Sequence, residues 1–231
     1  MYQHTKIILV FCSLISASVS VSSDAFVVSG PGWAGGQAMF YTMPVNTFGS
    51  NGLTRSQLQA ALKDALDEWS DNTAFSFTQV DSSSANISIC PSLNLNQVSV
   101  DPSQNDNGFT FSNVDCSGAA FSSGTLAIAS TFQTANAKIQ SSVVFNSDAT
   151  WDIYDGPLRS SGFDVTRVAI HEVGHSIGLA HSTVTPSIML PSISDTDALQ
   201  ADDLAGIESL YGVFVSVINI MPVIKLLLLD D

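Results

Sequence analysis

The chain has 231 residues, of which 45% are hydrophobic and only 12% are charged. This length suits one domain with a sizeable core. The formal net charge of −14 argues against a nucleic-acid partner, because phosphate recognition needs clustered Lys and Arg. Solubility explains the acidity, and calcium binding is a second explanation, since Ca²⁺ prefers oxygen ligands.

The N-terminus is typical of a signal peptide, which we place at residues 1–22. The short, weakly basic "MYQHTK" precedes the apolar run "IILVFCSLISASVSV", which is too short to span a bilayer. A buried N-terminal strand is the alternative. We therefore expect a secreted or periplasmic protein without a transmembrane span.

Two cysteines remain after removal of that segment, since Cys12 lies inside it. An even number of cysteines in an exported chain indicates a disulfide between Cys90 and Cys116, which would contribute about 3 kcal/mol. Two free buried thiols are the alternative.

The first half of the chain begins with an irregular Gly- and Ser-rich segment at 24–36 and a strand at 37–44, ended by Pro44. Residues 54–70 predict an amphipathic helix that begins with a capping box between Thr54 and Gln57. Its apolar residues recur at helical spacing and indicate a core-facing stripe: Leu58, Leu62, Ala65, Leu66 and Trp69.

Further strands are predicted at 75–81, 85–90, 125–132 and 140–146, with a long polar stretch at 91–124. Helices are predicted at 165–178 and 199–212, the latter with Asp202 and Asp203 in its first turn, where the helix dipole favours acids. This order of elements indicates the α+β class. The apolar tail 213–231 is interrupted by Pro222 and Lys225, and we expect it to pack or to add a strand. A surface-contact or sorting role is the minority view.

The stretch "HEVGHSIGLAHS", residues 171–182, contains three of the four histidines of the chain. On a helix, His171 and His175 project from one face and can hold Zn²⁺, while Glu172 can reach a metal-bound water. Gly178 can end the helix in a left-handed conformation, so that His181 returns to the same metal. Three histidines leave one tetrahedral position open, which is typical of catalytic zinc.

These residues resemble the metzincin motif HExxHxxGxxH, and Ser182 after the third histidine resembles the matrixin branch, peptidase family M10. "SIMLP" places Met189 like the Met-turn of that family, and "LQADDLAGIESLYG" resembles its last helix. "SANISIC", "GTLAIASTF" and "SSVVFNSDATW" are similar to its third, fourth and fifth strands.

The resemblance implies a zincin-like catalytic domain over residues 24–212. This domain would have a twisted, mostly parallel five-stranded sheet, three helices and zinc at the floor of a cleft. It implies that the strand with Leu126 and Ala127 pairs with an extended peptide substrate. It also implies that Pro191 to Ile193 form the wall of the pocket for the residue after the scissile bond. Arg167 either narrows this pocket or is a solvated helix residue.

The implied activity is that of a secreted zinc endopeptidase acting on polypeptides, with Glu172 as general base toward a zinc-bound water and Met189 as a structural floor. A non-catalytic zinc-containing binding module is one alternative, which the intact Glu172 disfavours. A peptidase dedicated to one protein target is another. We expect a monomer.

The sequence departs from animal matrixins, whose second, structural zinc is held by histidines where Ile128 and Val144 stand here. We therefore predict a single zinc. The calcium carboxylates of the family are also partly replaced, by Asn146 and Ala149. Candidate calcium ligands remain, although polar loop turns account for them as well: Asp101, Asp106, Asp148 and Asp152.

Overall fold

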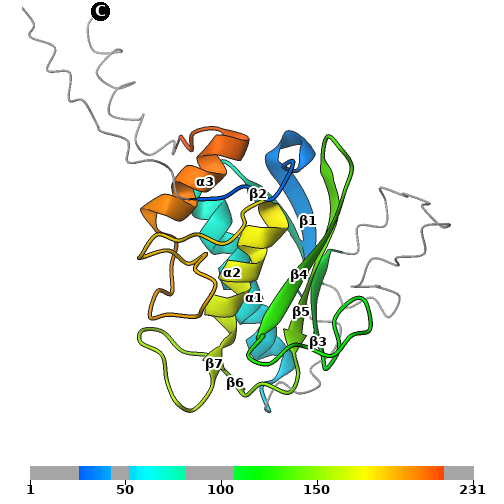
Figure 1. Cartoon of the computed structure of the whole chain (residues 1–231), viewed down its shortest axis with the longest axis vertical. Coiled ribbons are helices and arrows are strands. Elements are labelled where there is room, and N and C mark those ends of the chain that lie inside the picture. The colour runs from blue at the N-terminus through cyan, green and yellow to red at the C-terminus, as the bar shows by residue number, and fades with distance from the viewer. Residues whose placement is uncertain (1–25, 43–51, 82–106, 216–231) are drawn as a thin grey trace, which may run out of the picture.

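The computed structural model describes residues 26–42, 52–81 and 107–215. In this part of the chain, a five-stranded sheet packs against helices α1 and α2, and α3 lies at the upper end of α2 (Figure 1). The predicted α+β class is confirmed, with three α-helices and a short 3-10 helix, η1, at Ala34–Gly36.

Helix α1, Arg55–Asn72, supports the helix that carries the histidines. It begins with the predicted capping box, in which the backbone N–H of Thr54 donates to Oε1 of Gln57 at 2.9 Å. All five residues of the predicted apolar stripe are buried. At the end of this stripe, Nε1 of Trp69 donates to the carbonyl of Ile170 at 2.9 Å, which joins α1 to the residue before His171.

The sheet has the strand order β2-β1-β3-β5-β4. The strands are β1 Gln37–Tyr41, β2 Ser76–Val80, β3 Gly108–Ser112, β4 Ala127–Gln133 and β5 Lys138–Asn146. Only β4 runs antiparallel to its neighbour, and it lies at one edge. A second, two-stranded parallel sheet joins β6 Trp151–Asp152 to β7 Phe163–Asp164. The expected mostly parallel, five-stranded sheet is confirmed.

The core between sheet and helices is rich in aromatic rings. Phe111 and Phe145 stack with their centroids 4.9 Å apart, and Trp151 meets Phe145 edge-on at 5.3 Å. Such contacts stabilise a core beyond the area they bury. They join β5 to its neighbour β3 and to Trp151 of the strand β6.

Strand β3 lies within residues 91–124, where the sequence predicts only a polar stretch, and this prediction is wrong for the strand. Its side chains are buried from Gly108 to Phe111. The short "GFTFS" is surrounded by Asn, Asp and Ser, so the composition of the region concealed it. The predicted strand at 85–90 lies outside the described residues, and the first strand ends at Tyr41 within its predicted range.

Several predictions fall partly or wholly outside the described residues. The signal peptide 1–22 and the tail beyond residue 215 are among them. The first tail residues, Val213 to Val215, are exposed and form no strand, so this part does not pack as we expected. Cys116 is disulfide-bonded, while Cys90 lies outside the described residues. Within the described ranges, no helix has both the length and the apolar character needed to cross a membrane.

Candidate metal centre

Helix α2, Val165–Ile177, holds two of the three histidines. It begins at Asp164, whose carboxylate accepts hydrogen bonds from the backbone of Thr166 at 3.3 Å and Arg167 at 2.9 Å. It ends at Gly178, which has a φ of 124°. A left-handed turn at this glycine was predicted, and it reverses the chain so that His181 returns toward the helix.

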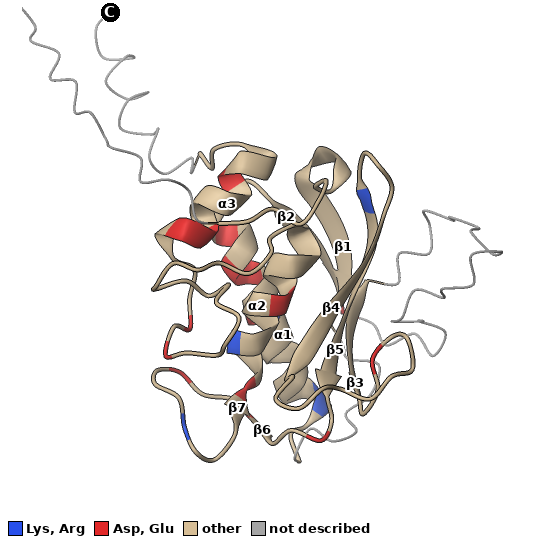
Figure 2. Ribbon diagram, in the orientation of Figure 1, with Lys and Arg blue, Asp and Glu red and all other residues tan. Residues whose placement is uncertain are grey.

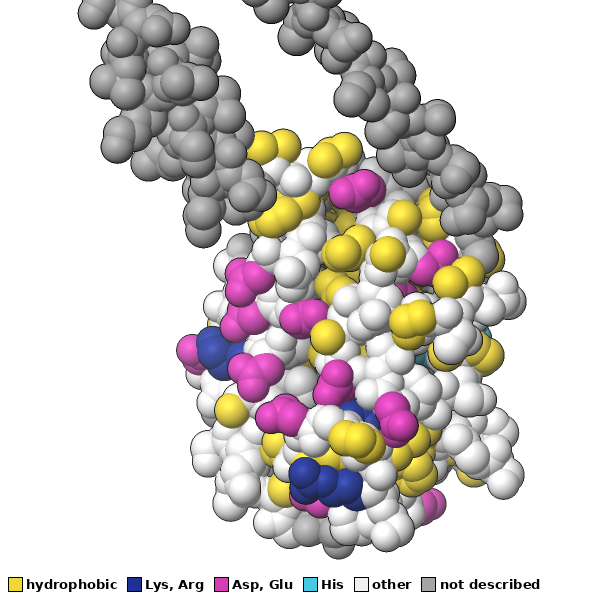
Figure 3. Space-filling model, turned by 90° about the vertical axis from the view of Figure 1, so that its left-hand side faces the viewer, with side chains coloured by type: hydrophobic (Ala, Val, Ile, Leu, Met, Phe, Trp, Pro, Cys, Tyr) yellow, Lys and Arg dark blue, Asp and Glu magenta, His cyan; other side chains and the backbone are white. Residues whose placement is uncertain are grey.

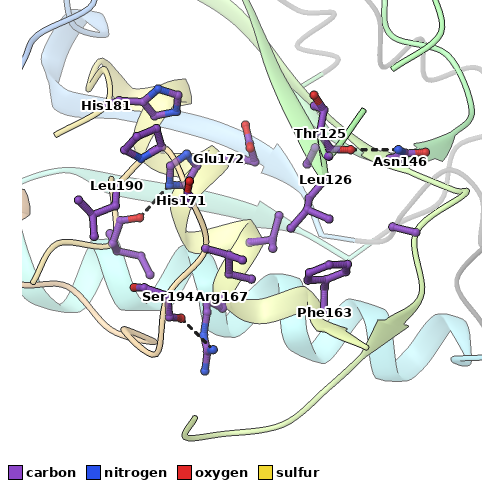
Figure 4. Close-up of a pocket in the computed structure, with 18 of the residues that line it drawn as sticks. Thr125, Leu126, Asn146, Phe163, Arg167, His171, Glu172, His181, Leu190 and Ser194 are labelled. Carbon is purple, nitrogen blue, oxygen red and sulfur yellow. Dashed lines mark hydrogen bonds between the residues drawn. The ribbon is translucent and has the colours of Figure 1, made fainter. Parts of the chain in front are cut away.

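The three imidazoles converge, and Figure 4 shows two of them, His171 and His181, at the cleft beside Glu172. One nitrogen from each of His171, His175 and His181 lies within 4.8 Å of the other two. The Nε2 atoms of His171 and His175 are 3.1 Å apart. Among the described residues, no other group of three His, Cys, Asp or Glu side chains comes this close.

Hydrogen bonds to the backbone fix the tautomers of the two helical histidines. Nδ1 of His171 donates to the carbonyl of Ile188 at 2.7 Å, and Nδ1 of His175 donates to that of Leu179 at 2.8 Å. The Nε2 lone pairs therefore face each other without a proton between them. Burial lowers the pKa of His171 to about 4 and, together with the neighbouring His171, lowers that of His175 to about 3.

This donor set fits a zinc ion. Two Zn–N bonds of about 2.0–2.1 Å at a tetrahedral angle place their nitrogens roughly 3.3 Å apart, close to the 3.1 Å between the Nε2 atoms of His171 and His175. Neutral imidazoles with Nδ1 bound to a carbonyl are also the form that binds zinc. The three histidines are the residues that would hold it.

Glu172 lies on the side of α2 that faces β4 and lines the cleft beside His171 and His181. Its side chain is buried, and burial raises its pKa to about 8, against the opposing effect of a hydrogen bond from the backbone of Ala129. A carboxylate with a raised pKa, next to a metal-binding group, has the properties of a proton carrier near neutral pH.

The turn with Met189 packs directly against α2. A Cβ atom added to Gly174 would overlap the sulfur of Met189, so methionine and helix are in close contact between the two helical histidines. Ser182, next to His181, donates its backbone N–H to the carbonyl of Met189 at 2.8 Å. The turn therefore adjoins all three histidines, and the role of Met189 as a structural floor stays a prediction.

Asp203 holds this turn, a role that the sequence pattern does not indicate. Asp203 is fully buried and accepts from the hydroxyl of Ser187 at 2.6 Å and from the backbone of Ile188 at 3.0 Å. Its neighbour Asp202 accepts from the hydroxyl of Ser182 at 2.6 Å. The pattern assigned both acids only to the first turn of α3, Ala201–Tyr211, where they do lie. Nothing in the local pattern indicates contacts to residues 15 to 20 positions earlier.

A cleft of about 700 Å³ extends from the histidines between β4 and α2 (Figure 4). All five predicted substrate residues line it: Leu126, Ala127, Arg167, Pro191 and Ile193. The side chain of Arg167 is only 2% exposed, so the solvated alternative for this residue is wrong. The lining also includes Phe163, Ser194 and Thr196, which no sequence pattern predicts.

The positions that carry the second zinc in animal matrixins lie opposite each other in the sheet. Ile128 of β4 pairs with Val144 of β5, and neither side chain can bind a metal. Of the calcium candidates, Asp101 and Asp106 lie outside the described residues. Asp148 is exposed, and Asp152 accepts from the hydroxyl of Ser161 at 3.2 Å. Calcium binding stays a prediction.

The fold and the site together define the class of the protein: a zincin-like fold, in which a helix with two histidines one turn apart lies beneath the edge strand of a mixed sheet. Residues 33–212 match the sequence model of the family described as matrixin, and the chain belongs to this family. Matrixins are zinc metalloendopeptidases.

Individual relatives agree with this assignment. The chain is 34% identical to bovine interstitial collagenase over 162 residues, which cover 69% of the chain and 29% of that protein. It is 28% identical to karilysin of Tannerella forsythia over 168 residues, covering 71% and 30% respectively. It is 44% identical to rat matrilysin over 72 residues, covering 29% and 26%. The matched part thus spans less than a third of each of these relatives.

Proposed function

We propose that this protein is a secreted or periplasmic zinc endopeptidase that hydrolyses peptide bonds in extended polypeptide chains. The observation that carries the proposal is the juxtaposition of three histidines with Glu172 in a cleft that also borders the edge strand β4. A structural zinc site would be closed by a fourth protein ligand, and the described residues offer none within this group.

His171, His175 and His181 would hold the zinc ion, which supplies a Lewis acid for activating water and the scissile carbonyl. Glu172 accepts the proton of the attacking water and returns it to the leaving amine. Its place in the cleft beside His171 and His181 suits both steps, because a general base must lie within reach of the proton that it accepts. The carbonyl of Ile188 orients His171, Met189 packs against α2 at Gly174, and neither residue takes part in proton transfer.

The substrate would bind along β4. In the described sheet, this strand pairs only with β5, so its other edge is available to an extended peptide next to Glu172. Main-chain hydrogen bonds to such an edge hold a substrate without demanding one sequence. Side-chain preference would then come from the cleft wall that includes Arg167, Pro191 and Ile193.

Proteolysis of casein tests the proposal. The purified, zinc-loaded protein is compared with Glu172→Gln and with Glu208→Gln, an exposed carboxylate on α3 that serves as the matched control. We expect Glu172→Gln to keep its zinc and lose about 10²–10⁴-fold in rate, while the control and the wild type cut equally. A folded, zinc-loaded wild type that cuts nothing, or a Glu172→Gln protein that cuts normally, contradicts the proposal.

A further inference from the structure

Asn146, the last residue of β5, lies beside the start of the edge strand β4. Figure 4 shows its side chain directed at the backbone of Thr125. Both residues line the cleft, together with Leu126 and Ala127. In the proposed function this segment pairs with the substrate backbone, so the contacts that fix its position bear on substrate affinity.

The backbone ladder between β4 and β5 extends to Leu126, whose carbonyl accepts from the N–H of Asn146 at 2.8 Å. The following N–H, that of Ser147, turns away to the carbonyl of Ser112 in β3, also at 2.8 Å. The backbone of β5 thus leaves the ladder at this point. The carbonyl of Thr125, one residue before Leu126, is bound by a side chain instead.

The side-chain amide of Asn146 makes that contact. Its Nδ2 donates to the carbonyl of Thr125 at 3.0 Å, and its Oδ1 accepts from the backbone N–H of Asp148 at 3.0 Å. These two neighbours determine the orientation of the amide, because a carbonyl can only accept and a backbone N–H can only donate. A carboxylate at this position would face the carbonyl of Thr125 with an oxygen, and the hydrogen bond would be lost.

The backbone of Asn146 is attached to the core. Its carbonyl accepts from Nε1 of Trp151 at 2.9 Å and from the N–H of Ala149 at 3.2 Å. Trp151 is buried, and its ring meets that of Phe145, the residue before Asn146, edge-on. The core therefore fixes Asn146, and Asn146 in turn binds the first residues of the edge strand.

The turn before β4, residues 122–125, is exposed at Ser122 and Gly124. The N–H of Thr125 donates to the carbonyl of Ser122 at 3.1 Å, and the hydroxyl groups of the same two residues are 2.7 Å apart. These bonds hold the turn together without attaching it to the sheet. The amide of Asn146 supplies an attachment.

Charge does not contribute to recognition along β4. None of its seven residues is charged, whereas acidic side chains lie on the helices and on the loops beside them (Figure 2). Figure 3 looks onto that helical side. An extended peptide at β4 would therefore be held by main-chain hydrogen bonds. Their strength depends on where the backbone of β4 lies, because an N–H···O bond weakens away from about 2.9 Å.

Asn146 acts at the end of β4 that lies away from Glu172. The backbone of Ala129 donates to Glu172. Thr125 precedes Ala129 by four residues, which is about 13 Å along an extended strand. Proton transfer at Glu172 should therefore be independent of Asn146, while binding of a long substrate should depend on it.

We propose that Asn146 is a positioning residue that holds the Thr125–Leu126 end of β4 in place for pairing with long peptide substrates. The proposal rests on the proposed peptidase function for its substrate readout. Asn146 strengthens the binding of the part of the substrate that passes Leu126, and it leaves the chemical step at the scissile bond unchanged.

Fluorogenic peptides of different length test this role. A short peptide is compared with versions of it that are lengthened by three residues at one end or the other. We expect lengthening at one end to lower KM in the wild type. In Asn146→Ala, KM for that longer peptide should rise about fivefold, while kcat and the KM of the short peptide are retained. Asn136→Ala, which removes an exposed asparagine from the turn between β4 and β5, should keep the wild-type values.

Asn146→Asp separates the hydrogen bond from the size of the side chain. The carboxylate has nearly the same size but cannot donate to Thr125, so KM for the longer peptide should rise at least as much as in Asn146→Ala. The buffer contains no free calcium, because a cation can join the new carboxylate to the carbonyl of Thr125. If Asn146→Ala does not fold, Asn146→Asp decides the question.

Wild-type KM values in a folded Asn146→Ala or Asn146→Asp protein overturn the proposal. So do equal changes in KM for short and long peptides, or a wild type whose KM does not depend on length. Hydrogen–deuterium exchange without substrate is the second readout: Asn146→Ala should speed exchange in residues 122–127 and leave residues 165–177 unchanged. If the wild type cuts no peptide, the proposed function fails, and the exchange result alone then confirms or overturns the role of Asn146 in fixing the strand.

Discussion

The backbone carbonyl of Ile188 lies 2.7 Å from Nδ1 of His171, and the N–H of the same residue donates to Asp203 at 3.0 Å. Ile188 therefore links the buried carboxylate of Asp203 to His171, a candidate zinc ligand. Partners of this kind orient metal-binding histidines and usually influence metal affinity strongly.

Replacement of Asp203 by Asn should weaken zinc binding by about 10–100-fold. Both carboxylate oxygens accept, Oδ1 from Ser187 and Met189 and Oδ2 from Ile188 and Gln200, so an amide NH₂ on either side would face backbone donors. Competition with a chelator of known affinity measures the effect. Asp202→Asn is the control: it contacts the rotatable hydroxyl of Ser182 and should lose little. Equal losses in both variants would contradict this role for Asp203.

Addition of a methyl group at Gly174 should destabilise the protein, although alanine is the better helix former by about 1 kcal/mol. The new Cβ would overlap the sulfur of Met189 and come within 3.0 Å of the Trp69 ring, and overpacking of this kind costs about 1–3 kcal/mol. Urea denaturation of Gly174→Ala measures the effect. The sign of the change in the free energy of unfolding is decisive, because a stabilised variant would mean that the contact between Met189 and α2 is loose.

The sequence predicted the parts of the site that depend on regular spacing. Helical periodicity located α1 and α2, and the interval from His171 to His181 depends on one helix and one glycine turn. It could not predict the support of Ile188 by Asp203 or the hydrogen bonds from Arg167 to the carbonyls of Gly156 and Ser194. Those depend on how separate loops approach each other, and no local pattern encodes that approach.

Strand β3 shows the same limit within the fold. β3 is the central strand of the sheet, between β1 and β5, and Phe109 and Phe111 are buried in the core cluster. The strand is too short for its apolar pattern to be recognised among the polar residues around it. The family resemblance supplied the five-stranded sheet but placed its third strand at 85–90, outside the described residues.

Zinc should stabilise the folded protein through the three histidines. A ligand that binds only the folded state adds about 4 kcal/mol at a free concentration 1,000 times its Kd. We therefore expect a chelator to lower the melting temperature of the wild type and of Glu172→Gln by similar amounts. His181→Ala, which removes the exposed ligand of the group, should melt near the chelated wild type and respond little to added zinc. A full zinc response in His181→Ala would exclude it as a ligand.

The metal-free protein should respond to acid in two opposing ways. The pKa values of His171 and His175 are lowered to about 4 and 3, so the unfolded chain binds their protons first, and stability falls as pH drops below about 6.5. From pH 7 to 5 the loss is about 2 kcal/mol for each histidine. The pKa of Glu172 is raised to about 8, so its contribution is fully present below about 4.5 and is lost as pH rises.

Glu172→Gln separates these contributions, because its side chain stays neutral at every pH. In this variant, the unfolding free energy of the metal-free protein should fall steeply from pH 7 to 5 through the two histidines alone. In the wild type, buried Glu172 already holds a proton that the unfolded chain does not bind in this pH range, which offsets about 2 kcal/mol of that loss, so its pH profile should be shallower. Urea denaturation at both pH values gives the comparison. Parallel profiles would show that Glu172 ionises normally in the metal-free fold, and its burial would then not suffice to tune it as a general base.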